Sequence, residues 1–184
     1  MTLPLTRSPY RTTAHAAGGR TGSVRTPMTA PEPGPGIPVP EYGAWLRRGI
    51  SRDGGPLVED REVVWLQAGP YYADSRGFAG TTSFDGTRVH FHHLTGEPGE
   101  DAGTFHRDGA NLVEQGTNPD GGTFLEVWTP LPAAEEPYGS WSGPDHHVVR
   151  VGPHVVHVDA HSGTYWRLYP ARPSHMFSTY ATRT

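Results

Sequence analysis

The chain has 184 residues, of which 34% are hydrophobic, with 24 glycines, 19 prolines and no cysteine. This length suits one domain, and the turn-rich composition favours a β protein over a helical bundle. The absence of cysteine excludes disulfides, cysteine-ligated zinc and a thiol nucleophile. No stretch approaches the roughly 18 apolar residues of a membrane span, and no charged-then-apolar leader occurs. We therefore expect a cytoplasmic protein with no membrane partner.

Charge is distributed unevenly along the chain. Residues 1–31 carry four arginines and no carboxylate, whereas the remainder carries eleven arginines and nineteen carboxylates, a net charge of −8. Nucleic-acid binding needs a cationic face, so the acidic body predicts that no nucleic acid is a partner. Lysine is absent, which we interpret as the coding bias of a GC-rich bacterial genome.

The first forty residues lack apolar periodicity and end in the proline- and glycine-rich segment "TAPEPGPGIPVP". Such a segment buries too little apolar surface to offset its ordering entropy, which predicts a disordered arm over residues 1–40. Residues 1–27 superficially resemble a transit peptide. The preferred interpretation is an upstream extension, with Met28 as a possible true start. Residues 171–184 are expected to form a C-terminal tail.

From residue 43 onward the apolar pattern changes to a period of two. Short segments rich in valine, threonine and aromatic residues predict strands. They cover residues 43–50, 61–69, 78–84, 87–94, 103–107, 111–116, 123–129, 147–151, 154–159 and 164–169. The dipeptides Asp85-Gly86, Asp108-Gly109 and Asp120-Gly121 predict tight hairpins, because glycine accepts the positive φ that such turns require. Residues 130–146 are expected to form a long loop.

About ten short strands joined mainly by tight turns predict an antiparallel meander. Closing this meander into a barrel removes both exposed sheet edges. We therefore expect an all-β protein, an antiparallel up-and-down barrel of 8–10 strands over residues 41–170, whose first and last segments pair. A barrel of this size is either filled by side chains or holds one small ligand, and the sequence leaves both alternatives open.

Two residues at the ends of the predicted barrel carry a family resemblance. Gly43-x-Trp45 opens the first strand and Arg167 lies on the last. This arrangement is similar to the signature of lipocalin-type (calycin) barrels, and it implies a cation–π contact of Arg167 with the Trp45 indole that closes one barrel end.

A longer resemblance covers residues 100–128, "EDAGTFHRDGANLVEQGTNPDGGTFLEVW". The stretch resembles the fungal casein-kinase-interacting Hri protein family, which is built from calycin-like barrels. The matching positions are Asp101, Gly103, Gly109, Glu114, Gly116, Asn118, Pro119, Gly121, Glu126 and Trp128. The resemblance implies the barrel fold and hints at a protein partner.

Three histidines occur within four positions of the segment "RVHFHHL", residues 88–94. Strand alternation predicts one face with Arg88, His90, His92 and Leu94, and an inward face with Val89, Phe91 and His93. His90, His92 and Glu97 have the spacing of a cupin metal motif. The preferred interpretation is a solvated strand face, so no metal and no cofactor are expected.

A second histidine-rich segment, "VGPHVVHVDAHSG", spans residues 151–163. His154 and His157 differ by three positions and so lie on opposite faces of a strand. A calycin-like barrel can bind haem through one axial histidine. His157 or His161 could serve in that minor alternative.

Glu114 and Glu126 form the candidate acid–base pair. If the hairpin loop covers residues 118–122, Glu114 lies opposite Glu126, which shares a face with Phe124 and Trp128. Partial desolvation beside a second carboxylate predicts that at least one pKa is raised, as a general acid or base requires. The alternative is a structural strut in which a glutamate accepts a hydrogen bond from a tryptophan or arginine.

Three functions follow from these residues. The first is a binding module that holds a small, largely apolar molecule in the barrel. Its walls would be Trp45, Trp65, Phe91, Phe124 and Trp128, with Arg167 at the end. The second is a cofactor-independent cyclase or isomerase in which Glu126, with Glu114, works as acid or base. The third is a filled barrel that binds a protein partner through its surface.

Overall fold

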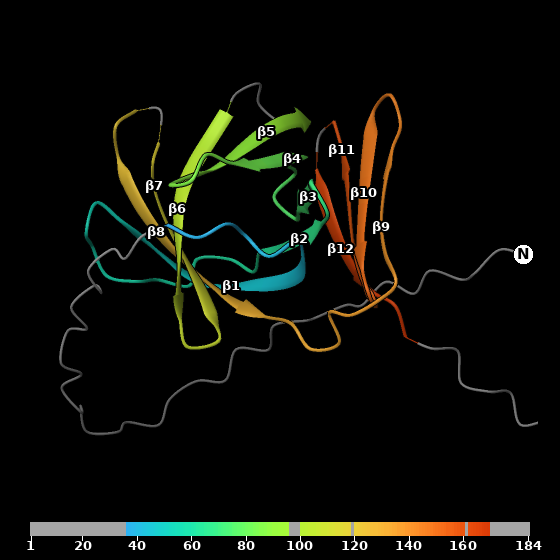
Figure 1. Ribbon diagram of the computed structural model, residues 1–184, viewed down its shortest axis with the longest axis horizontal. Helices are drawn as coiled ribbons and strands as arrows, with labels where there is room; N and C mark the ends of the chain where they lie inside the picture. The colour runs from blue at the N-terminus through green and yellow to red at the C-terminus, as the bar shows by residue number, and fades with distance from the viewer. Residues whose placement is uncertain (1–35, 96–99, 119, 161, 170–184) are drawn as a thin grey trace, which may run out of the picture.

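A computed structural model describes residues 36–95, 100–118, 120–160 and 162–169, which form twelve β-strands and no helix (Figure 1). Within these residues there is thus no helix that could cross a membrane. Most of the predicted N-terminal arm, and the tail over residues 171–184, lie outside the described residues. The last residues of the N-terminal arm, 36–40, are described. Ile37 and Val39 pack against the barrel core, and the Ile37 amide donates a hydrogen bond to the carbonyl of Phe105 at 2.9 Å.

The first eight strands form a closed antiparallel barrel in which each strand pairs with the next and β8 pairs with β1. Their bounds are β1 Tyr42–Arg52, β2 Val64–Ala68, β3 Tyr71–Asp74, β4 Ala79–Phe84, β5 Val89–Thr95, β6 Glu100–Asp108, β7 Asn111–Thr117 and β8 Thr123–Pro130. The all-β class and the antiparallel up-and-down barrel are therefore confirmed.

The closing strand differs from the prediction. The last predicted strand does not pair with the first. Instead, β8 pairs with residues 45–52 of β1 and closes the barrel. The register of β1 against β8 shifts between Arg47 and Gly49. Such a bulge bends a strand and re-aims its side chains. It allows one eleven-residue strand to pair with β2 at its start and with β8 toward its end.

The remaining strands form a separate four-stranded antiparallel sheet in the order β12-β11-β10-β9. Their bounds are β9 Tyr138–Ser142, β10 His146–Val151, β11 His154–Asp159 and β12 Gly163–Arg167. This sheet packs against the outside of the barrel over β2 and β3. The prediction of one barrel over residues 41–170 was therefore wrong for its last third. The expected loop over 130–146 contains β9, and β3 was not foreseen.

Two apolar layers hold the molecule together. The barrel interior contains an aromatic cluster that includes Trp45, Trp65, Phe105 and Trp128. The second layer lies between barrel and sheet. It comprises Ala44, Val64, Leu66, Ala68, Ala73, Ala79, Val149, Val151, Val156 and Val158. Buried positions alternate on β10 and β11 because only one face of the outer sheet meets the barrel.

Strand β2 belongs to both layers. All five of its residues are buried: Trp65 joins the barrel interior, whereas Val64 and Leu66 join the layer under the outer sheet. An antiparallel strand with one solvated face alternates polar and apolar residues. The continuous apolar run at this strand therefore reflects burial on both faces.

The predicted turns and the glycine–tryptophan signature have clear structural roles. Gly86, Gly109 and Gly121 adopt positive φ values of 100°, 58° and 89°, as the Asp-Gly pattern requires. A Cβ on Gly43 would lie 2.2 Å from the indole of Trp45. The Trp45 ring therefore packs directly over this glycine.

The predicted contact between Arg167 and Trp45 is not made. Arg167 lies on β12 of the outer sheet, exposed, with its guanidinium 5.8 Å from the centroid of Tyr169. Trp45 is 3% exposed and stacks on Trp65, with ring centroids 4.5 Å apart. The contact fails because the chain leaves the barrel after β8.

Candidate functional site

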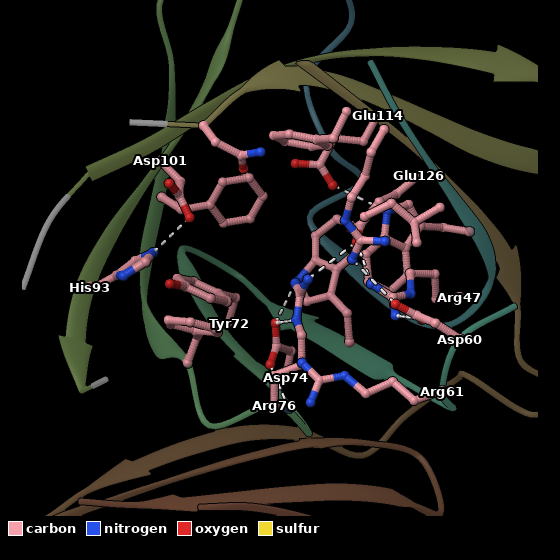
Figure 2. A pocket seen from close by; sticks show the side chains of 18 residues that line it. Arg47, Asp60, Arg61, Tyr72, Asp74, Arg76, His93, Asp101, Glu114 and Glu126 are labelled. Carbon is pink, nitrogen blue, oxygen red and sulfur yellow. Dashed lines mark hydrogen bonds and ion pairs between the residues drawn. The ribbon is translucent and has the colours of Figure 1, made fainter. Parts of the chain in front are cut away.

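A cavity of about 410 Å³ opens at one end of the barrel (Figure 2). This is the end where β1, β3, β5 and β7 finish and the following strands begin. Nine arginine and carboxylic side chains line the cavity: Arg47, Arg52, Asp60, Arg61, Asp74, Arg76, Asp101, Glu114 and Glu126. The cavity differs in this respect from the largely apolar interior that the sequence predicts.

The rest of the lining is mainly aromatic. Of the five predicted aromatic walls, the structure places Trp65, Phe91, Phe124 and Trp128 at the cavity. Trp128 meets Trp65 edge-on, with centroids 5.6 Å apart. Trp45 is packed behind Trp65 and does not line the cavity, nor does Arg167. Aromatic rings and charged groups therefore both line the cavity, and Arg76 lies against the rings of Phe78 and Trp128.

A chain of ion pairs crosses the charged part of the site. Arg47 joins Glu126, at 2.5 Å, to Asp60. Arg76 joins Glu126, at 3.2 Å, to Asp74, at 2.7 Å. The exposed Arg52 completes the series with a 3.2 Å contact to Asp60.

Alternating charge stabilises this chain of ion pairs. Three arginines and three carboxylates alternate along it, so each carboxylate touches at least one guanidinium. Arg47 and Glu126 have side chains only 2% and 3% exposed. Buried charges persist where they are paired and hydrogen bonded. Glu126, which accepts from both Arg47 and Arg76, is therefore held as a structural anion.

Arg76 enters the site from the turn between β3 and β4. Gly77, with φ of +115°, follows it and permits the tight reversal. The guanidinium of Arg76 lies 5.7 Å from the Phe78 centroid and 5.9 Å from the Trp128 centroid. A cation over an indole is thus present in this barrel. It is supplied by Arg76 and Trp128, not by the predicted Arg167 and Trp45.

Glu114 lies directly opposite Glu126 in the pairing of β7 with β8, as the hairpin length predicts. Its Oε2 accepts a 3.1 Å hydrogen bond from Trp128 Nε1. Burial, followed by the charge of Glu126, raises the pKa of Glu114 to about 8. The predicted raised pKa therefore belongs to Glu114, and the predicted struts are also present, on both glutamates.

His93, Asp101 and Tyr72 lie across the cavity from Arg47 and Glu126 (Figure 2). His93 Nε2 is 3.5 Å from Asp101 Oδ2, and this contact lowers the pKa of Asp101. Tyr72 is 3% exposed, and its hydroxyl has no hydrogen-bond partner among the described residues. The site thus presents a histidine–carboxylate pair and a phenol opposite Arg47 and Glu126.

The other predicted histidine sites lie elsewhere. His90 and His92 are on the outward face of β5, as predicted; His90 Nε2 contacts Asp85 and His92 Nε2 contacts Ser83, each at 2.9 Å. Glu97 and His161 lie outside the described residues. No group of three metal-ligating side chains occurs among the residues that are described.

His157, the other haem candidate, was placed wrongly. It lies on β11 of the outer sheet, not in the barrel. Its ring stacks on Trp166 with centroids 5.8 Å apart. It therefore cannot provide an axial ligand inside the barrel.

Sequence reasoning missed Arg47, Arg76 and Asp74. Arg47 has the same strand parity as Trp45, so alternation already aims it inward, and a buried arginine requires a carboxylate partner. Arg76 and Asp74 flank a turn, where nothing in the local pattern marks them as inward-facing. The contact of Arg76 with Glu126 joins residues 50 positions apart in the sequence.

The comparisons add no family to this description. No protein-family model, no curated protein and no solved structure matches the chain. The resemblance to the fungal Hri family is thus a prediction from residues 100–128. The fold and the geometry of the cavity carry the functional argument.

Proposed function

We propose that the barrel binds a small amphipathic molecule in the cavity at its open end. The observation that carries this proposal is the cavity of about 410 Å³ whose lining combines aromatic rings with a set of fixed charges. Ligand pockets of proteins combine apolar surface with a few placed polar groups, and they start at about 300 Å³. This volume favours a ligand over the alternative of a filled barrel that binds only through its surface.

The charged side chains of the lining change the ligand that we expect. A purely apolar molecule would leave the ion pairs around Arg47 and Arg76 without water on their cavity side, which is costly for charged groups. A molecule with one flat apolar face and a polar edge can contact both the aromatic rings and the charged groups of the lining. The apolar face meets Trp65, Phe91 and Phe124, and the polar edge meets the charges.

Native mass spectrometry of the full chain, followed by titration with flat ring compounds, tests this function. Quenching of tryptophan emission reports binding, because Trp65 and Trp128 line the cavity. Phe124→Ala should weaken binding about fivefold, since an aromatic contact contributes roughly 1 kcal/mol. Phe84→Ala, in an exposed ring outside this cavity, is the matched control. A chain that carries no small molecule and binds no ring compound would exclude the function.

The second candidate is a cofactor-independent cyclase or isomerase. It is favoured by an acid and a base on separate sides of one cavity, Glu114 and the His93–Asp101 pair. This assignment moves the acid from Glu126 to Glu114, because Glu126 is committed to two arginines. Glu114→Gln should then preserve ligand affinity and abolish turnover.

The cytoplasmic location, the bacterial origin, the calycin-like family and a protein partner are predictions of the sequence.

A further inference from the structure

Glu114 is a buried carboxylate of the cavity, and its contacts with the described residues leave one of its two oxygens available to a ligand. Its Oε2 accepts from Trp128 Nε1, and no described residue is hydrogen bonded to its Oε1. A Cβ on Gly103 would lie 2.9 Å from Oε1, so the absence of a side chain at Gly103 makes room for this oxygen. Glu114 lines the cavity.

The neighbours of Glu114 determine where a proton resides. Glu126 faces it across the hairpin and Asp101 lies on the adjoining β6. Arg76 is the cation that favours the ionised form of Glu114. Its side-chain hydrogen bonds, however, are made to Asp74 and Glu126. Two buried carboxylates side by side do not both ionise without cost. Since Glu126 has the arginines, the proton belongs on Glu114.

The indole then selects the oxygen that carries the proton. An indole N–H only donates, so Oε2 must act as an acceptor. In a neutral carboxylic acid the second oxygen bears the hydrogen. The hydrogen of Glu114 is therefore on Oε1, which has no acceptor among the described residues.

We propose that Glu114 donates this Oε1 hydrogen to an oxygen of the bound molecule, so that the cavity selects flat ring compounds bearing a carbonyl, phenolate or similar acceptor oxygen. The inference rests on the proposed binding function and narrows its ligand class. The raised pKa of Glu114, about 8, is consistent with it and sets the pH at which the donor is lost.

Three naphthalenes of similar shape separate the possible outcomes. 2-Ethylnaphthalene has the ring alone, 2-acetylnaphthalene adds an acceptor oxygen, and (2-naphthylmethyl)trimethylammonium adds a permanent cation. Titration by tryptophan quenching at pH 6.5 should give about tenfold tighter binding of the acetyl compound than of the ethyl compound, the size of one hydrogen bond. At pH 9.5 this preference should disappear, and the cationic compound should bind more tightly than at pH 6.5.

Variants of Glu114 supply the internal test. Glu114→Gln retains a neutral donor and should keep the acetyl preference at both pH values, whereas Glu114→Leu should abolish it at both. Glu135→Gln, an exposed glutamate outside the cavity, should behave as the wild type. Equal binding of acetyl and ethyl compounds to the wild type at pH 6.5 would overturn the inference and leave the binding function standing. If none of the three compounds binds, the binding function itself fails.

Discussion

Glu114 and Glu126 are cross-strand neighbours in the barrel, yet the two arginines in contact with this pair both bind Glu126. The asymmetry divides the pair into a structural anion and a protonated acid. Sites that hold two titratable groups in different environments often assign them different roles. The two glutamates differ here because Arg47 and Arg76 form ion pairs with Glu126 on β8 and not with Glu114 on β7.

The first prediction concerns stability against pH. In the unfolded chain Glu114 titrates near its ordinary pKa of 4.5, and in the folded chain near 8. Between these values the folded state binds more protons, so its free energy of unfolding falls as pH rises, and the loss is complete above pH 8. Urea unfolding of wild type and Glu114→Gln from pH 5 to 9 measures this. The wild type should lose stability relative to the variant; a constant difference would contradict the raised pKa.

The second prediction compares two arginines that share Asp60. Arg47 is 2% exposed and Arg52 is 54% exposed. Removing one partner of a buried ion pair costs about 3 kcal/mol or more, whereas an exposed pair contributes at most about 1 kcal/mol. Arg47→Met should therefore destabilise strongly in urea unfolding, and Arg52→Met weakly. The double variant Arg47→Met/Glu126→Gln should recover part of the loss, because the buried carboxylate at position 126, which Arg47→Met leaves with Arg76 alone, is then replaced by a neutral amide.

A third prediction concerns two glycines in the barrel wall. Alanine at Gly103 would place its Cβ 2.9 Å from Glu114 Oε1, and alanine at Gly116 would place it 2.4 Å from the ring of Phe124. Overpacking costs typically about 1–3 kcal/mol. We expect both variants to lose stability, but only Gly103→Ala to change the pH dependence assigned to Glu114. Identical pH profiles for the two variants would argue against that assignment.

The fourth prediction concerns His154 beneath the outer sheet. Its Nδ1 is 2.7 Å from the Tyr165 hydroxyl and its Nε2 is 2.8 Å from the carbonyl of Pro132. Burial lowers the pKa of His154. Stability from the neutral ring is complete above the ordinary pKa of about 6.5 and is lost as pH falls below it, because the unfolded chain then binds more protons. In thermal unfolding, the Tm of the wild type should therefore fall relative to the Tm of His154→Gln as pH is lowered from 7 to 5.

The local sequence pattern was sufficient to predict most of the barrel's strands. Alternation identified seven of its strands, and the Asp-Gly pairs identified three of the turns, because both signals are confined to a few neighbouring residues. The hairpin length alone placed Glu114 opposite Glu126. Strand β3 was missed because its four residues are too short to show a period.

Closure of the barrel could not be read in the same way. Alternation tells which side chains share a face, not which distant strand supplies the hydrogen bonds of β1. One signal did exist: the unbroken apolar run at 63–66 indicates burial on both faces, which a barrel with a solvated outer wall does not require. The ion pairs of the site were hidden for a related reason, since Arg47 and Glu126 are 79 residues apart.

Burial of β2 on both faces also limits the substitutions that this strand can accept during evolution. Val64, Leu66 and Ala68 are held by the outer sheet while Trp65 and Gln67 are held by the barrel, so no position in this strand is free to accept a polar or larger replacement. A saturation library scored for folded protein should find β2 the least permissive segment of the chain.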